Sequence, residues 1–138
     1  MKSVFYVILL TLVTLSSVCS QPRPEAKALE LAKRSHTLRG DKEVEFFIDE
    51  FLKKRHDGVK RLGWEVKKER NQEYLVSYIY EIHSFKEGIG KRGFFFLVNL
   101  SDGSVHNVTH EHVQKMPPFE KFYKDEKDLV DDLLKQKF

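Results

Sequence analysis

A hairpin signal in the second half of the chain constrains the fold most. Residues 94–100 form an apolar run, FFFLVNL, and the turn-forming residues SDGS at 101–104 separate it from a mixed run that begins at Val105. An Asp-Gly pair between two strand-like runs is among the strongest short-range signals of a β-hairpin. The run before the turn is apolar on both faces, so we expect a central strand there. The mixed run through residue 112 should lie nearer the sheet edge.

The first 20 residues have the pattern of a secretory signal peptide. Lys2 gives a short positive start, residues 4–13 form an apolar core, and small residues that include Ser20 follow it. A segment of this kind is removed on export, and its core is shorter than the about 20 residues that a membrane span needs. Cleavage before Gln21 would also remove Cys19, the one cysteine of the sequence. We therefore expect an exported protein, secreted or periplasmic.

The same segment allows an alternative, a membrane-anchored lipoprotein. Residues 15–19, LSSVC, resemble a bacterial lipobox, whose cysteine is lipidated and becomes the first residue of the mature chain. Val18 stands where a smaller residue is usual, but Cys19 lies at the expected place. Cys19 is thus a candidate lipidation site, and membrane attachment through it stays open.

Charge and composition exclude some partners. The sequence of 138 residues suggests one domain, and its net charge is +3. Without residues 1–20, which hold one Lys and no acidic residue, 23 basic and 21 acidic side chains remain. This balance, with no dense Lys/Arg run, predicts no nucleic-acid binding.

Hydrophobic periodicity predicts the order helix, helix, four strands, helix. Residues 25–37 are rich in helix formers, and apolar residues from Val44 to Leu62 recur at three- and four-residue steps, which indicates a long amphipathic helix. From Trp64 the period changes to two, and residues 74–82 alternate as a strand. The glycines of residues 84–92 indicate a mobile loop. Pro117 and Pro118 should end the sheet before a last helix near residues 125–136.

These elements predict an α+β fold: an antiparallel four-stranded sheet with a long amphipathic helix packed on one face, and extra N- and C-terminal helices. We expect four parts: a signal peptide (1–20), an N-terminal linker and helix (21–40), the α+β domain (41–116) and a C-terminal helix (117–138). Phe94, Phe95 and Phe96 are consecutive, so at least one ring must lie on the face away from the long helix. The C-terminal helix, a second subunit in a homodimer or an apolar ligand could cover that face, and a ligand is the least favoured.

A helix followed by a meander of antiparallel strands resembles the cystatin-like fold. Residues 98–105, VNLSDGSV, are also similar to the strand-turn-strand of PepSY-type domains, in which an Asp-Gly turn joins two such strands. The resemblance covers residues 41–112 at the level of the fold. Inhibitory cystatins carry a Gln-x-Val-x-Gly loop, which this sequence lacks, so the resemblance does not carry over cysteine-protease inhibition.

Candidate site residues are few. His106, His110 and His112 share parity, so a strand through them would place all three on one face, where alternate histidines can chelate zinc. We favour the interpretation that these histidines are exposed polar residues at the end of a strand, and we expect no metal or other cofactor. Asn99 and Asn107 begin Asn-x-Ser/Thr sequons and are candidate N-glycosylation sites in a eukaryotic secretory pathway.

No motif of nucleophilic or acid–base catalysis is present in the sequence, and we expect no enzyme. The favoured function is an exported, non-enzymatic domain that binds an unknown protein partner in the cell envelope or the extracellular space. The alternative is a small-ligand or metal-binding protein, or a minor enzyme, that uses the concave sheet face and the edge formed by His106, His110 and His112.

Overall fold

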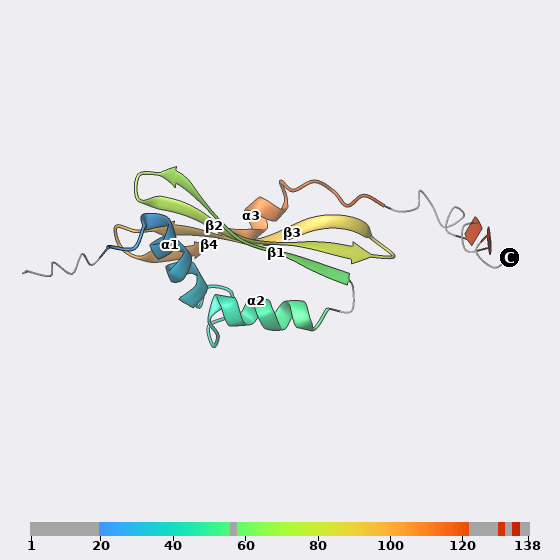
Figure 1. The fold of residues 1–138 in the computed structure, drawn as a ribbon, viewed down its shortest axis with the longest axis horizontal. Helices are drawn as coiled ribbons and strands as arrows, with labels where there is room; N and C mark the ends of the chain where they lie inside the picture. Colours follow the sequence, from blue (N-terminus) through green and yellow to red (C-terminus); the bar gives the residue numbers. More distant parts are fainter. Residues whose placement is uncertain (1–19, 56–57, 122–129, 132–133, 136–138) are drawn as a thin grey trace, which may run out of the picture.

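The computed structural model describes residues 20–55, 58–121, 130–131 and 134–135. Its elements are α1 (Pro24–Arg34), α2 (Val44–Lys53), β1 (Gly58–Arg70), β2 (Glu73–Ser84), β3 (Gly88–Asn99), β4 (Ser104–Asn107) and α3 (Thr109–Val113). Figure 1 shows α2 on one side of the sheet and α3 on the other. The α+β class and the antiparallel four-stranded sheet are thus confirmed.

The sheet is a meander with the strand order β1-β2-β3-β4. β3 pairs with β2 along its whole length and with β4 from Phe96 to Asn99, so the predicted central position of residues 94–100 is confirmed. The turn before β4 forms as the Asp-Gly signal predicts. Gly103 adopts a φ of 72°, and the amide of Ser104 donates to Oδ1 of Asp102 at 2.9 Å.

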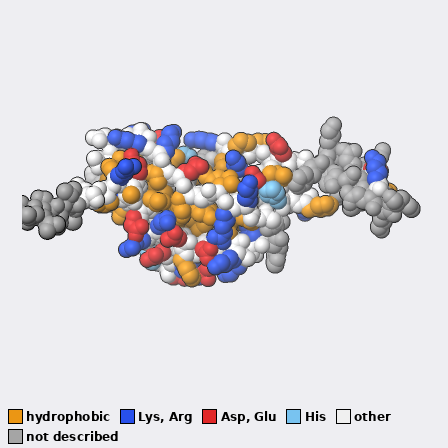
Figure 2. Space-filling view, in the orientation of Figure 1, with side chains coloured by type: hydrophobic (Ala, Val, Ile, Leu, Met, Phe, Trp, Pro, Cys, Tyr) orange, Lys and Arg blue, Asp and Glu red, His pale blue; other side chains and the backbone are white. Residues whose placement is uncertain are grey.

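The core lies between the sheet and the two helices α1 and α2. Val44, Ile48 and Leu52 follow one another at four-residue steps and bury one stripe of α2. Two alanines of α1, Ala28 and Ala32, are fully buried in the same cluster. The sheet contributes alternate residues of β2 and β3, namely Tyr74, Val76, Tyr78, Tyr80, Ile82, Phe96 and Val98. In the space-filling view, hydrophobic side chains gather near the middle of the molecule and charged ones flank them (Figure 2).

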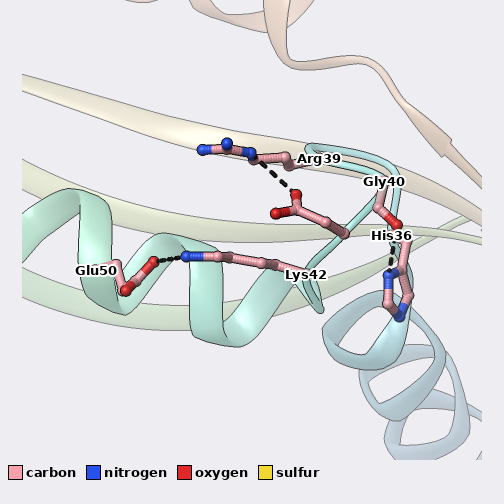
Figure 3. A network of polar contacts seen from close by, with 6 residues as sticks. His36, Arg39, Gly40, Lys42 and Glu50 are labelled. Atoms are coloured by element: carbon pink, nitrogen blue, oxygen red, sulfur yellow. Dashed lines mark hydrogen bonds and ion pairs between the residues drawn. The ribbon is translucent and has the colours of Figure 1, made fainter.

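Polar contacts fix the segment that leads into α2 (Figure 3). Lys42 pairs with Glu50 of α2, Arg39 pairs with Asp41 at 2.9 Å, and His36 contacts the carbonyl oxygen of Gly40 at 3.2 Å. The amide of Val44 donates to the carbonyl oxygen of Ser35 at 2.8 Å. These contacts hold the start of α2 against the end of α1.

The predicted long helix is wrong. α2 ends at Lys53, and the residues predicted as its last turn belong to β1. Val59 pairs with Ile82 and Arg61 with Tyr80 of β2. Val59 and Leu62 continue the helical spacing, but pairing with a long buried strand outweighs that local pattern. Gly63 has a φ of 102° and lies beside a register shift within β1.

The predicted mobile loop at residues 84–92 is also wrong. The turn comprises Phe85, Lys86 and Glu87, and β3 begins at Gly88. Gly88 and Gly90 pair with Ser84 and Ile82 of β2.

The far face of the sheet is partly covered by α3, a helix that the sequence patterns did not predict. Phe95 is 8% exposed, and its ring stacks on that of His112 at a centroid distance of 4.9 Å. α1 ends at Arg34, before the predicted residue 37. The predicted helix at 125–136 falls mostly on residues outside the described part, as does the signal peptide at 1–20 except for Ser20.

Candidate functional site

A groove of about 790 Å³ lies on the α2 side of the sheet. Its lining comes from the segment after α2, the facing ends of β2 and β3, the turn between these strands, and the segment after α3. The lining residues are Arg55, Tyr80, Ile82, Lys86, Glu87, Arg92, Pro118, Phe119 and Lys121. We call this hollow the basic groove, because four of these side chains are cationic and one is a carboxylate.

Buried side chains of β2 form the floor of the basic groove. Tyr80 and Ile82 are buried neighbours on the core face of β2. Tyr80 packs against Phe94 at a ring-centroid distance of 5.9 Å and against Phe51 of α2 at 6.5 Å. Burial raises the pKa of the Tyr80 hydroxyl, while the positive charges of Arg55 and Arg92 oppose this rise. The tyrosine is therefore neutral at physiological pH.

Arg92 is held at one wall of the groove. Its guanidinium carbon lies 4.0 Å from the centroid of the Phe119 ring, and Nη1 donates to the carbonyl oxygen of Lys91 at 2.8 Å. Within the described part of the chain, no carboxylate forms an ion pair with Arg92, Lys86 or Lys121. These cations are therefore available to an anionic group.

Two glycines of β3 let the segment that carries Phe119 approach the sheet closely. A Cβ on Gly90 would lie 1.8 Å from Cδ1 of Phe119, and one on Gly88 would lie 2.0 Å from the carbonyl oxygen of Glu120. The φ of Gly88 is 102°, which side-chain-bearing residues rarely adopt. Glycine at both positions thus makes room for the segment that carries Phe119.

Backbone hydrogen bonds hold this segment on the outer edge of β3. The amide of Ile89 donates to the carbonyl oxygen of Glu120 at 2.9 Å, and the amide of Glu120 donates to the carbonyl oxygen of Ile89 at 2.8 Å. Pro117 and Pro118 precede this bridge and have no N–H, so the pairing cannot extend into a full strand. The result is a short, fixed wall rather than a fifth strand.

The three predicted histidines do not share a strand face. β4 ends at Asn107, where the amide of Thr109 donates to the side-chain oxygen of Asn107 at 3.0 Å, and α3 begins. His106 is exposed on β4, Nε2 of His110 contacts Gln114 at 2.9 Å, and His112 stacks on Phe95. The prediction that the three histidines share one strand face is wrong, because the strand ends before His110. Among the described residues no group of three or more His, Cys, Asp or Glu side chains could hold a metal ion.

The two sequon asparagines lie at strand ends. Oδ1 of Asn99 accepts from the amide of Ser101 at 2.9 Å, and Asn107 is exposed. Cys19, the candidate lipidation site, lies outside the described residues.

Sequence reasoning did not identify the basic groove. Its cations come from four separate segments, and no local motif joins them. The available signal was the pair Gly88 and Gly90, since glycines within a strand can mark a close approach of another backbone.

In the described part of the chain, none of the helices has the length and apolar character of a membrane span. The chain matches no protein-family model, no curated protein and no solved structure. Its architecture is that of an α+β domain, an antiparallel meander with helices packed on it.

Proposed function

We propose that this protein is an exported, non-enzymatic binding domain that takes an acidic segment of a partner protein into the basic groove. The observation that carries the proposal is the excess of cations around an apolar floor, with Lys86, Arg92 and Lys121 in no ion pair among the described residues. Arginine and aromatic side chains are enriched in protein interfaces. A groove of this size suits a few residues of a peptide rather than a flat contact.

The arrangement of the groove supports binding by a prepared surface. Phe119 and the carbonyl oxygen of Lys91 orient the Arg92 guanidinium before a ligand arrives, which lowers the entropy lost on binding. A carboxylate at Arg92 would place neighbouring apolar atoms of the ligand over Tyr80 and Ile82. The ligand therefore combines acidic with apolar residues.

We further propose a fold family and a cellular location for the domain. The order of a helix and an antiparallel meander supports a cystatin-like or PepSY-like fold, and the signal-peptide pattern supports export. Lipidation at Cys19 would keep the domain at a membrane surface with the groove free to bind. Intact mass of the mature protein distinguishes an acylated Cys19 from a free start at Gln21.

Binding of a labelled peptide tests the function. The probe is a short peptide of alternating Glu and Leu, and a peptide of alternating Lys and Leu is its charge-reversed control. We expect the acidic peptide to bind, and Arg92→Glu to weaken its affinity about tenfold or more. Lys121→Glu, at an exposed position of the same groove, should also weaken it.

The matched control is Lys115→Glu, which makes the same charge change at an exposed residue outside the groove lining. Equal losses in Arg92→Glu, Lys121→Glu and Lys115→Glu would show attraction to overall charge and contradict the groove. Equal binding of the two peptides would also contradict it. Metal or small-ligand binding at the histidines gains no support from their positions, and we do not propose it.

A further inference from the structure

The sheet has one long edge that is unpaired in the described part of the chain. β1 has 13 residues and pairs with β2 on one side, and no backbone hydrogen bond joins its other side to a described residue. The opposite edge, β4, has four residues. A long edge of this kind carries a row of unpaired N–H and C=O groups that can pair with another strand.

Two register shifts limit the regular part of this edge. One lies between Arg61 and Gly63 and the other between Lys68 and Arg70. Shifts of this kind bend and twist a strand, which interrupts pairing with a new strand. Residues 63–68 lie between them and pair with β2 without a shift, so a new strand would pair there.

One face of this stretch carries two opposite charges. Glu65 and Lys67 are both exposed, on the face away from the core. Lys67 contacts Glu69 at 3.3 Å, but its side chain is still 76% exposed. An exposed pair of this kind contributes little to stability, and an ammonium group has three donors, so Lys67 can also bind a second carboxylate. The stretch therefore presents an acidic and a basic group two residues apart.

The other face of the stretch carries two apolar side chains and one cation. Trp64 and Val66 are half-buried and pack against the core from its rim, and Lys68 is exposed beside them. Lys68 forms no ion pair with a described residue. Lys33 lies 5.6 Å from the centroid of the Trp64 ring, and its charge is balanced by Glu45 at 2.9 Å.

We infer that two copies of this chain pair antiparallel along this edge, about a twofold axis at Val66, and join their four-stranded sheets into one. In this register Glu65 of each copy lies opposite Lys67 of the other, so four charges alternate in sign around the axis. Opposite charges that face each other stabilise a strand pair. On the core face the two Val66 side chains meet, and Trp64 faces Lys68 of the other copy, which suits a cation–π contact.

Charge selects this register and favours a second copy as the partner. An axis at Glu65 would place that carboxylate opposite itself, and axes at Lys67 or Lys68 would do the same for a lysine; like charges directly opposite each other destabilise a strand pair. An axis at Trp64 would confine regular pairing to residues 63–65. A twofold dimer uses the same patch on both copies, which requires a patch that is complementary to itself. This edge is separate from the basic groove and does not depend on its function.

Sedimentation of charge-reversed variants tests this inference. We expect the protein to form a dimer whose fraction rises with concentration. Glu65→Lys gives each copy two positive charges that face two positive charges, so the dimer should weaken about tenfold or more, and Lys67→Glu should weaken it equally with negative charges. In an equal mixture, the Glu65→Lys copy opposes two positive charges to the two negative charges of the Lys67→Glu copy, and a mixed dimer should form.

Matched controls make the same charge changes elsewhere. Glu120→Lys and Lys115→Glu alter exposed residues after α3 and should leave the dimer unchanged. Amide hydrogen exchange in residues 64–68 should be slower at high protein concentration than at low. A monomer at every concentration would overturn the inference, as would two Glu65 and Lys67 variants that stay monomeric when mixed. A dimer that all four variants weaken equally, or one without added protection of residues 64–68, would place the contact elsewhere and also overturn it.

Discussion

Arg92 of β3 stacks on Phe119, with its guanidinium carbon 4.0 Å from the ring centroid. A guanidinium over an aromatic face at this distance is a favourable cation–π contact. The contact joins the central strand to the segment after α3, and both residues line the basic groove. Because this segment also bridges to Ile89 through its backbone, the wall and the cation of the groove are fixed together.

The first prediction concerns the space at Gly90. Gly90→Ala should push Phe119 away, because the new Cβ would lie 1.8 Å from Cδ1 of that ring. We expect a loss of about 1–3 kcal/mol in the free energy of unfolding, typical of overpacking. Urea denaturation measures it. Gly40→Ala is the control, since a Cβ there meets no atom within 4 Å, and equal effects of the two changes would contradict the close approach.

The second prediction concerns the centre of the core. Phe96 is 0% exposed, so Phe96→Ala should cost about 3–5 kcal/mol of unfolding free energy. Phe46, on α2, is 54% exposed, and Phe46→Ala should change stability much less. Thermal and urea unfolding of both variants measure this difference. A small loss at Phe96 would show that β3 is not the central strand.

The third prediction concerns acid stability. Hydrogen bonds from Lys53 and then Arg61 lower the pKa of Asp49 below 3.8, and Lys42 lowers the pKa of Glu50 below 4.5. A carboxyl with a lower pKa in the folded state stabilises the fold above its unfolded pKa, and this contribution is lost as pH falls through the folded pKa. The free energy of unfolding should therefore decline as pH falls below about 4.5.

Lys42→Met tests the cause of the shift at Glu50. NMR titration of the Glu50 carboxyl should show its pKa rise toward 4.5, whereas the pKa of Asp49 should change less because its own partners remain. Lys27→Met serves as the control for loss of a positive charge. A Glu50 pKa that stays low in Lys42→Met would refute the assigned pair.

The sequence predicted the elements whose patterns are local. The apolar run at 94–100 is central because both of its faces need covering, and Asp102 and Gly103 form the turn that their chemistry favours. The boundary between α2 and β1 was not predictable in the same way. Val59 continues a helical spacing, and its place is decided by pairing with Ile82, a contact distant in sequence.

The candidate site was harder to predict than the fold, because it is formed by contacts between residues that are distant in sequence. Gly88 and Gly90 were predicted as part of a loop, but they pair with Ser84 and Ile82 of β2. Phe119 and Glu120, which are distant in sequence, pack directly on them. The predicted face of three histidines required the strand to continue to His112. Local turn contacts at Asn107 end it, and no pattern in a single sequence marked that end.

Chemical-shift mapping tests the central claim, that the basic groove binds an acidic segment. The labelled domain is titrated with the Glu-Leu peptide, and the amide signals of Tyr80, Arg92 and Phe119 are followed. We predict saturable shifts at these residues, which Arg92→Glu removes and Lys115→Glu preserves. Shifts spread over the surface cations, with none concentrated at these residues, would contradict the account.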